Sequence, residues 1–122
     1  MFIANRLSSH PMIAKVLYPG LEGFPQIELA RAQMSGFGGM ITIELKGKFE
    51  NAAKFCDHLH LFTIAPSLGG TESLITMPVT TTHHGVSKEE RVERGISDTM
   101  VRISIGLESK EDLLEDLTQA LG

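Results

Sequence analysis

The most regular pattern in the chain is a strict alternation of side chains from Thr99 to Leu107, which predicts a β-strand. One face would carry an aliphatic row, made of Val101, Ile103, Ile105 and Leu107. The other face would carry Met100, Arg102, Ser104 and Gly106. Arg102 is the only charged residue in this stretch. Because the aliphatic row has to be buried on a core, we expect Arg102 on the opposite face of the sheet.

Further strand and helix patterns alternate along the chain, with short connections and no internal repeat. The strands are expected at 14–18, 40–45, 61–65 and 72–76, and the helices at 2–7, 25–34, 49–59, 87–94 and 110–121. The helix beginning at Ser87 has the pattern of a capping box, with Glu90 three residues on, and Ser109 is the expected cap of the last helix. This order predicts an α/β two-layer sandwich, a small, mostly antiparallel sheet with helices packed on one face.

Size and composition are those of one globular domain. The chain has 122 residues, with 42% hydrophobic and 21% charged residues. A net charge of −4 with no basic run disfavours nucleic acid as a partner. No apolar stretch reaches the length of a membrane span, and the first residues lack a signal-peptide pattern. A single cysteine, Cys56, allows no internal disulfide and favours a reducing, cytoplasmic setting.

A glycine-containing turn is the second notable stretch, with the sequence Ser-Leu-Gly-Gly-Thr-Glu-Ser-Leu at 67–74. Two adjacent glycines let the backbone turn sharply or approach another group closely. We expect backbone amides beside Ser67 and the guanidinium of Arg102 to face the same small anion. The guanidinium fork matches a carboxylate. The alternatives are an ordinary tight turn at Ser67 and a surface arginine paired with a nearby glutamate at Arg102.

Other reactive residue types point to structure rather than chemistry. His83 and His84 are adjacent, so they would point apart in an extended chain, and a metal site is not expected. Cys56 lies on the core face of a predicted helix, where packing is the better interpretation. We expect most of the acidic cluster to form a solvated helix face; its members are Glu108, Glu111, Asp112, Glu115 and Asp116. No general base is paired with a nucleophile, so no catalytic residue is expected in this chain.

Six short motifs in one order carry a family resemblance. They are Tyr-Pro-Gly-Leu at 18–21, Met-Ser-Gly-Phe-Gly-Gly-Met at 34–40, Ser-Leu-Gly-Gly-Thr-Glu-Ser-Leu at 67–74, Thr-His at 82–83, Gly-Ile-Ser-Asp at 95–98 and Val-Arg-Ile-Ser-Ile-Gly-Leu-Glu at 101–108. The chain resembles the C-terminal domain of the pyridoxal-phosphate (PLP)-dependent transsulfuration enzymes, which include cystathionine gamma-synthase, cystathionine gamma-lyase, cystathionine beta-lyase and methionine gamma-lyase. The resemblance implies that residues 1–122 form a single C-terminal, substrate-carboxylate-binding domain of a fold-type I PLP enzyme. It also implies that the family's N-terminal PLP-binding domain lies outside this sequence.

The resemblance assigns roles to four residues. Arg102 would hold the α-carboxylate of the substrate amino acid, and Ser67 would lie beside both cofactor and substrate, with Leu68 next to the cofactor. Pro66 stands at a position that helps to set reaction specificity, and that is often acidic in gamma-synthases and gamma-lyases. The cofactor, pyridoxal 5'-phosphate, would supply the electron sink. No lysine of this chain matches the family's Schiff-base position, so the cofactor is not expected on this chain alone.

The resemblance also implies substrates and partners. The substrates would be cystathionine, homocysteine or activated homoserine, and the partners an N-terminal PLP domain, in cis or in trans, and further copies in a homo-oligomer, a tetramer in the family. The sequence of Ile64–Ser67, together with that of Met34–Gly39, resembles plant-type gamma-synthases most. The alternatives are a cystathionine or methionine gamma-lyase type and a non-catalytic module that binds an amino acid or a partner. Phe2, Ile3 and Leu7 are expected to face the PLP domain, and so to form an exposed apolar patch here.

Overall fold

The computed structural model describes residues 1–65, 67–79, 87–93 and 97–122, and these contain one five-stranded sheet. The strands are β1 (Ile13–Leu17), β2 (Met40–Leu45), β3 (Thr63–Ile64), β4 (Leu74–Thr76) and β5 (Met100–Ser104). Their order across the sheet is β1-β2-β5-β4-β3, and every neighbouring pair is antiparallel except β3 with β4. The predicted small, mostly antiparallel sheet is therefore confirmed.

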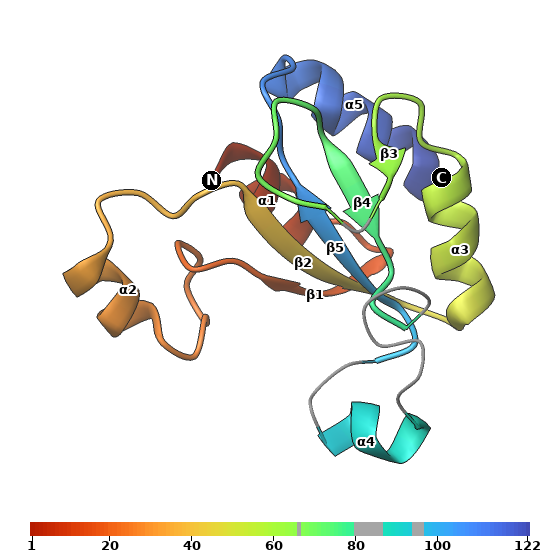
Figure 1. The fold of residues 1–122 in the computed structure, drawn as a ribbon, viewed down its shortest axis with the longest axis horizontal. Coiled ribbons are helices and arrows are strands. Elements are labelled where there is room, and N and C mark those ends of the chain that lie inside the picture. Colours follow the sequence, from red (N-terminus) through yellow and green to blue (C-terminus); the bar gives the residue numbers. More distant parts are fainter. Residues whose placement is uncertain (66, 80–86, 94–96) are drawn as a thin grey trace.

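Three helices cover one face of this sheet (Figure 1). The helices in the described ranges are α1 (Phe2–Ser8), α2 (Ile27–Gln33), α3 (Phe49–Asp57), α4 (Lys88–Glu93) and α5 (Lys110–Leu121). Side chains of α1, α3 and α5 share one hydrophobic core with the sheet, whereas α2 and α4 project from the body. The two-layer sandwich with helices packed on one face is thus confirmed by α1, α3 and α5.

The alternation of apolar residues determines which face of the sheet meets these helices. In β2, Ile41, Ile43 and Leu45 are buried, while the residues between them are only half-buried. In β5, Val101 and Ile103 have no exposed surface. Each such side chain contributes about 1.5–3 kcal/mol through its burial. We call this side of the sheet the core face.

Local capping groups set the starts of two helices. The Ser109 Oγ accepts the Asp112 backbone N–H at 3.4 Å, and α5 then buries Leu113, Leu117 and Leu121 at four-residue spacing. The Ser87 Oγ accepts the Glu90 N–H at 3.2 Å before α4. Both predicted caps are confirmed.

The expected apolar patch on α1 is wrong. Ile3 is 5% exposed and Leu7 is 1% exposed, and Phe2 is half-buried. The helix contacts β1 and α5, so its apolar side has a partner within the chain. Amphipathic spacing shows that one helix face is buried, but it does not reveal which element covers that face.

Three strand details differ from the predictions. Leu107 is 82% exposed, because β5 ends at Ser104 and the alternation does not extend to the end of the motif. β1 spans Ile13–Leu17 rather than the expected 14–18, and its register with β2 shifts between Ile13 and Lys15. β3 has two residues rather than the five expected at 61–65. Predictions on Pro66, Thr82–His84 and Gly95 fall outside the described residues.

No helix in the described part of the chain is both long and apolar enough to cross a bilayer.

Candidate functional site

Arg102 lies in the middle of the sheet, on the face opposite α1, α3 and α5. It is half-buried in β5 and stands directly across from Thr42 of β2 and Thr76 of β4. Directly opposed residues project from the same side of a sheet, so the two threonines flank the arginine. Its chain neighbours Val101 and Ile103 point into the core, as the alternation requires. The expected placement of Arg102, away from the aliphatic row, is confirmed; its role stays a prediction.

The glycine turn is attached to this same side of the sheet. The Gly69 N–H donates to the Ser104 Oγ at 2.9 Å, and Ser104 is two residues beyond Arg102 on β5. Residues two apart on a strand share a face, so the turn and Arg102 are brought to one side of the sheet. Gly69 has φ 73, a left-handed conformation that favours glycine. We call the side defined by Thr42, Thr76, Arg102 and Ser104 the polar face.

Two site residues of the turn are exposed. Ser67 and Leu68 lie at the surface, Leu68 with 54% of its area exposed. An exposed hydroxyl with a neighbouring apolar side chain can contact a ligand that approaches the polar face.

A second set of bonds holds the far end of the turn. Ser73 is fully buried, its N–H donates to Glu108 Oε2 at 3.0 Å, and its Oγ donates to Glu108 Oε1 at 2.8 Å. The Gly106 N–H donates to the Ser73 Oγ at 2.9 Å, and the Leu107 N–H donates to the Thr71 carbonyl at 2.9 Å. A Cβ on Gly106 would lie 2.4 Å from the Thr71 oxygen, so only glycine fits there.

Glu108 was expected to belong to a solvated helix face, and that interpretation is wrong. It precedes α5 and is half-buried against the turn. Burial raises the pKa of its carboxyl group, whereas the hydrogen bonds from Ser73 and from its own backbone lower it. Together these hydrogen bonds outweigh burial, so the pKa lies below the ordinary 4.5. Because Glu108 precedes the expected helix cap, Ser109, the sequence already indicated that it lies outside the helix.

Asp116 also departs from the solvated face. It is 5% exposed, and its carboxylate accepts the His60 N–H at 2.9 Å and the Leu61 N–H at 2.7 Å. The Gln119 side-chain amide donates to it at 3.1 Å. Asp116 follows Leu113 by three residues, which puts it beside the apolar stripe of α5 and could have indicated burial. The remaining acidic residues of the helix, Glu111, Asp112 and Glu115, are exposed as expected.

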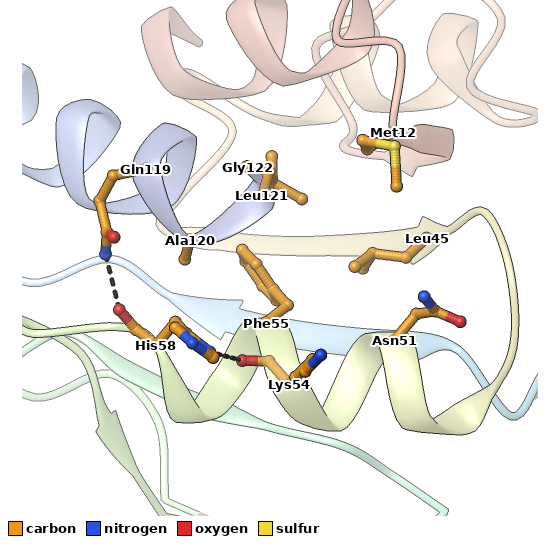
Figure 2. Close-up of a pocket in the computed structure, with 10 residues that line it drawn as sticks. All are labelled: Met12, Leu45, Asn51, Lys54, Phe55, His58, Gln119, Ala120, Leu121 and Gly122. Atoms are coloured by element: carbon orange, nitrogen blue, oxygen red, sulfur yellow. Dashed lines mark hydrogen bonds between the residues drawn. The ribbon is translucent and has the colours of Figure 1, made fainter.

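A pocket of about 280 Å³ lies on the helix side, between α3, the end of α5 and Met12 (Figure 2). Two hydrogen bonds join residues of its lining: the Gln119 Nε2 donates to the His58 carbonyl at 2.6 Å, and the His58 Nδ1 lies 2.7 Å from the Lys54 carbonyl. Its lining contains neither Arg102 nor any residue of the turn. The chemistry therefore favours the polar face over this pocket.

The lysines and the metal-ligating residue types determine whether this chain could hold PLP or a metal. A lysine that forms a Schiff base is kept desolvated, but every lysine side chain that the structure describes is exposed, namely Lys15, Lys46, Lys48, Lys54 and Lys110. These lysines do not fit covalent attachment of the cofactor. No cluster of three or more His, Cys, Asp or Glu suited to a metal occurs in the described ranges.

Cys56 is a core residue, as predicted. It is 6% exposed and belongs to the hydrophobic cluster under α3. Burial, and secondarily the neighbouring Asp57 carboxylate, raises the pKa of its thiol from 9.0 to about 12. A thiol in this state is a poor nucleophile.

Comparison with known proteins gives relatives over nearly the whole chain. Cystathionine gamma-lyase of Bos taurus is 51% identical over 121 residues, 99% of this chain and 30% of that protein. The same enzyme of Bacillus subtilis (strain 168) is 49% identical over 119 residues, 98% of this chain and 31% of that protein. The chain thus spans about 30% of the length of these curated relatives.

Solved structures agree with this. The cystathionine gamma synthase from Xanthomonas oryzae pv. oryzae, in complex with aminoacrylate and cysteine, is 47% identical with a TM-score of 0.92, over 98% of this chain and 31% of that one. A cystathionine gamma lyase (CalE6) from Micromonospora echinospora is 39% identical with a TM-score of 0.93, over the same shares. The family described as Cys/Met metabolism PLP-dependent enzymes matches residues 1–122. With the whole chain matched, and with its polar face and glycine turn in the fold of these enzymes, the protein belongs to the Cys/Met metabolism PLP-dependent enzyme family.

Proposed function

We propose that this chain provides the substrate α-carboxylate site of a PLP-dependent enzyme of sulfur amino-acid metabolism. Arg102 is the carboxylate ligand, and the substrate is cystathionine, homocysteine or activated homoserine. The observation that carries the proposal is the bond from Gly69 to Ser104, which attaches the glycine turn beside Arg102. A ligand on this face can therefore meet the guanidinium and the turn together.

The chemistry of Arg102 suits a carboxylate. Its planar guanidinium can donate two parallel hydrogen bonds to the two oxygens of a carboxylate. It emerges from a central strand, with β2 and β4 bonded on either side, so its Cα is held firmly. A rigid strand positions a binding group more accurately than a loop does. The flanking Thr42 and Thr76 add no competing charge in the same row of the sheet.

Ser67, Leu68 and Pro66 complete the proposed site. Ser67 and Leu68 are exposed on the turn, where they can contact the substrate and the cofactor respectively. The proposed part of Pro66 in reaction specificity rests on the resemblance alone, since Pro66 lies outside the described residues.

The described lysines do not fit cofactor attachment, so we assign the cofactor to another domain. We propose that residues 1–122 act as one C-terminal domain beside a PLP-binding domain, in cis or in trans, within a homo-oligomer. PLP supplies the electron sink for carbanion chemistry when it is bound, and this chain binds and orients the amino acid. A lone, buried Cys56 supports a reducing, cytoplasmic setting.

The reaction type divides the relatives. The curated relative that is 51% identical in sequence to this chain is a cystathionine gamma-lyase, whereas a solved structure that is 47% identical is a cystathionine gamma synthase. The gamma-synthase assignment, suggested by the sequence around Pro66, is the form that we propose, with a gamma-lyase as the alternative. A chimaera can distinguish them.

The test replaces the matching part of the Bacillus subtilis cystathionine gamma-lyase with residues 1–122. We expect the visible spectrum of the chimaera to show bound PLP. The Arg102→Ala form should keep the cofactor but lose the ability to use the substrate. Cleavage of cystathionine, compared with replacement on activated homoserine by cysteine, separates the two reaction types. The 122-residue chain alone, mixed with PLP and dialysed, should keep no cofactor absorbance. Unchanged kcat/KM in the Arg102→Ala chimaera would refute the assignment.

A further inference from the structure

The glycine turn is attached to the end of β5 and the residues just beyond it by a set of polar groups that no reaction chemistry requires. We name this set the clasp and define it as Ser73, Ser104, Gly106 and Glu108. We propose that Glu108, acting through Ser73, is a positioning residue that holds the Ser67 turn in place beside Arg102. This inference rests on the proposed function only in so far as the turn is part of the substrate site.

The clasp binds both ends of the turn. At one end the Ser104 Oγ accepts the Gly69 N–H, and at the other the Glu108 carboxylate accepts both the N–H and the hydroxyl of Ser73. The residues between these two anchors are Gly70, Thr71 and Glu72. One anchor, Ser104, ends β5, and the other, Glu108, follows four residues later, so the turn has little freedom to move along the sheet.

Ser73 is the link that transmits the position of Glu108. Its side chain is fully buried, donates to Glu108 Oε1 at 2.8 Å and accepts from the Gly106 N–H at 2.9 Å. The single hydroxyl proton is therefore committed to the carboxylate. The close approach of Thr71 to Gly106 leaves no room for the turn to shift toward β5. Loss of the carboxylate leaves the buried Ser73 N–H without its acceptor, so the turn has to rearrange.

The charge of Glu108 is satisfied by these donors. Glu108 takes part in no ion pair with another of the described residues. A carboxylate that accepts hydrogen bonds from both the N–H and the hydroxyl of one residue fixes both the backbone and the side chain of that residue. That is the geometry expected of a group that sets position rather than one that binds a ligand.

The first experiment measures amide hydrogen exchange by NMR on the 122-residue chain. In Glu108→Ala we expect the Gly69 and Ser73 amides to exchange about tenfold faster, as the loss of an ordinary hydrogen bond implies. The Ile43 amide, in the core strand β2, should be unaffected. Glu111→Ala removes an exposed carboxylate three residues away and is the matched control. Glu108→Gln keeps an acceptor for the Ser73 N–H, so it should retain part of the protection and serves if Glu108→Ala does not fold.

The second experiment uses the chimaera. We expect Glu108→Ala to raise KM for the amino-acid substrate about tenfold while leaving the cofactor spectrum unchanged, and to add little in an Arg102→Ala background. A purely structural role would lower the melting temperature without this KM effect. If Arg102→Ala has no effect, the proposed function fails, and the exchange result alone then decides the role of Glu108. Unchanged Gly69 exchange, or faster exchange with an unchanged KM in an Arg102-dependent enzyme, would overturn the inference.

Discussion

The two faces of the sheet are held in different ways. The core face depends on apolar side chains from the sheet and from α1, α3 and α5, which together exclude water, with Ile43, Val101 and Ile103 fully buried. The polar face depends on individual hydrogen bonds, such as that from Gly69 to Ser104, and carries a half-buried cation in its centre. Apolar burial tolerates substitutions of similar volume, whereas a hydrogen bond requires a particular pair of groups in one geometry. A substrate site benefits from the second kind of support.

The largest expected effect belongs to the polar face. Arg102→Ala in the chimaera removes two charge-assisted hydrogen bonds to a carboxylate, each worth about 1.5–3 kcal/mol. With allowance for non-additivity, we expect a loss of about 3–4 kcal/mol, or roughly two to three decades in kcat/KM. Arg102→Lys should recover only part of this, because lysine lacks the fork. Steady-state kinetics with the exposed Arg31→Ala as control measures the effect, and loss of cofactor and fold together would contradict it.

The core face should respond in stability instead. Ile43→Ala leaves a cavity at a fully buried position, and we expect the free energy of unfolding to fall by about 3 kcal/mol. Thr42→Ala, one residue earlier on the polar face, should cost less than about 1 kcal/mol. Urea denaturation of the two variants checks the contrast. Equal costs at the two positions would mean that the faces do not differ in the way described.

Asp116 is an intermediate case, because it is a polar group on the helix side. Asp116→Ala leaves the His60 and Leu61 amides without their acceptor, and we expect a loss of about 2 kcal/mol in unfolding free energy. Asp116→Asn keeps one acceptor oxygen and should lose less. The exposed Glu115→Ala, one residue earlier, is the control. An Asp116→Ala variant as stable as this control would show that water replaces the carboxylate.

The clasp should weaken in acid. Glu108 has a pKa below its ordinary 4.5 when folded, so its contribution to stability is present above pH 4.5 and is lost as the pH falls through the folded pKa. Because this carboxylate is partly exposed, solvent screening reduces that contribution. We expect the stability difference between the parent chain and Glu108→Gln to shrink from about pH 7 to about pH 3.5. A difference that is constant over this range would contradict the role of the charge.

Local patterns in the sequence predicted the position of Arg102 and of the glycine turn, but not the long-range hydrogen bonds made by the buried carboxylates. The alternation around Arg102 and the glycine pair that follows Ser67 and Leu68 can each be recognised within a few residues. The structure places Arg102 opposite Thr42, away from the aliphatic row, and bonds the glycine turn to Ser104 on the same side. The bond between Ser73 and Glu108 spans 35 residues, and Asp116 reaches back 56 residues to His60. In both, a carboxylate bonds a backbone N–H, a donor that is the same in almost every residue type. No residue pattern marks such a partner.

The burial of α1 was missed for a related reason. The spacing of Ile3 and Leu7 shows an apolar side, and that side is covered by α5, more than a hundred residues later in the chain. The exposed Leu107 is the converse case, since its place in an alternating run favours burial but the strand ends before it. Hydrophobic pattern identifies which residues can form a core, and the tertiary arrangement determines which of them do.

The smallest expected effect is chemical and again contrasts the two faces. Burial raises the pKa of the Cys56 thiol to about 12, so at about pH 8 roughly one molecule in ten thousand is a thiolate. We expect a water-soluble thiol reagent to leave Cys56 unmodified in the native chain and to label it fully in urea. A Ser67→Cys thiol in a Cys56→Ala background lies on the exposed turn and should react at once, with no measurable change in stability. Rapid labelling of Cys56 in the native chain would mean that the core opens far more often than its packing implies. The two faces would then differ in residue composition but not in how well they exclude water.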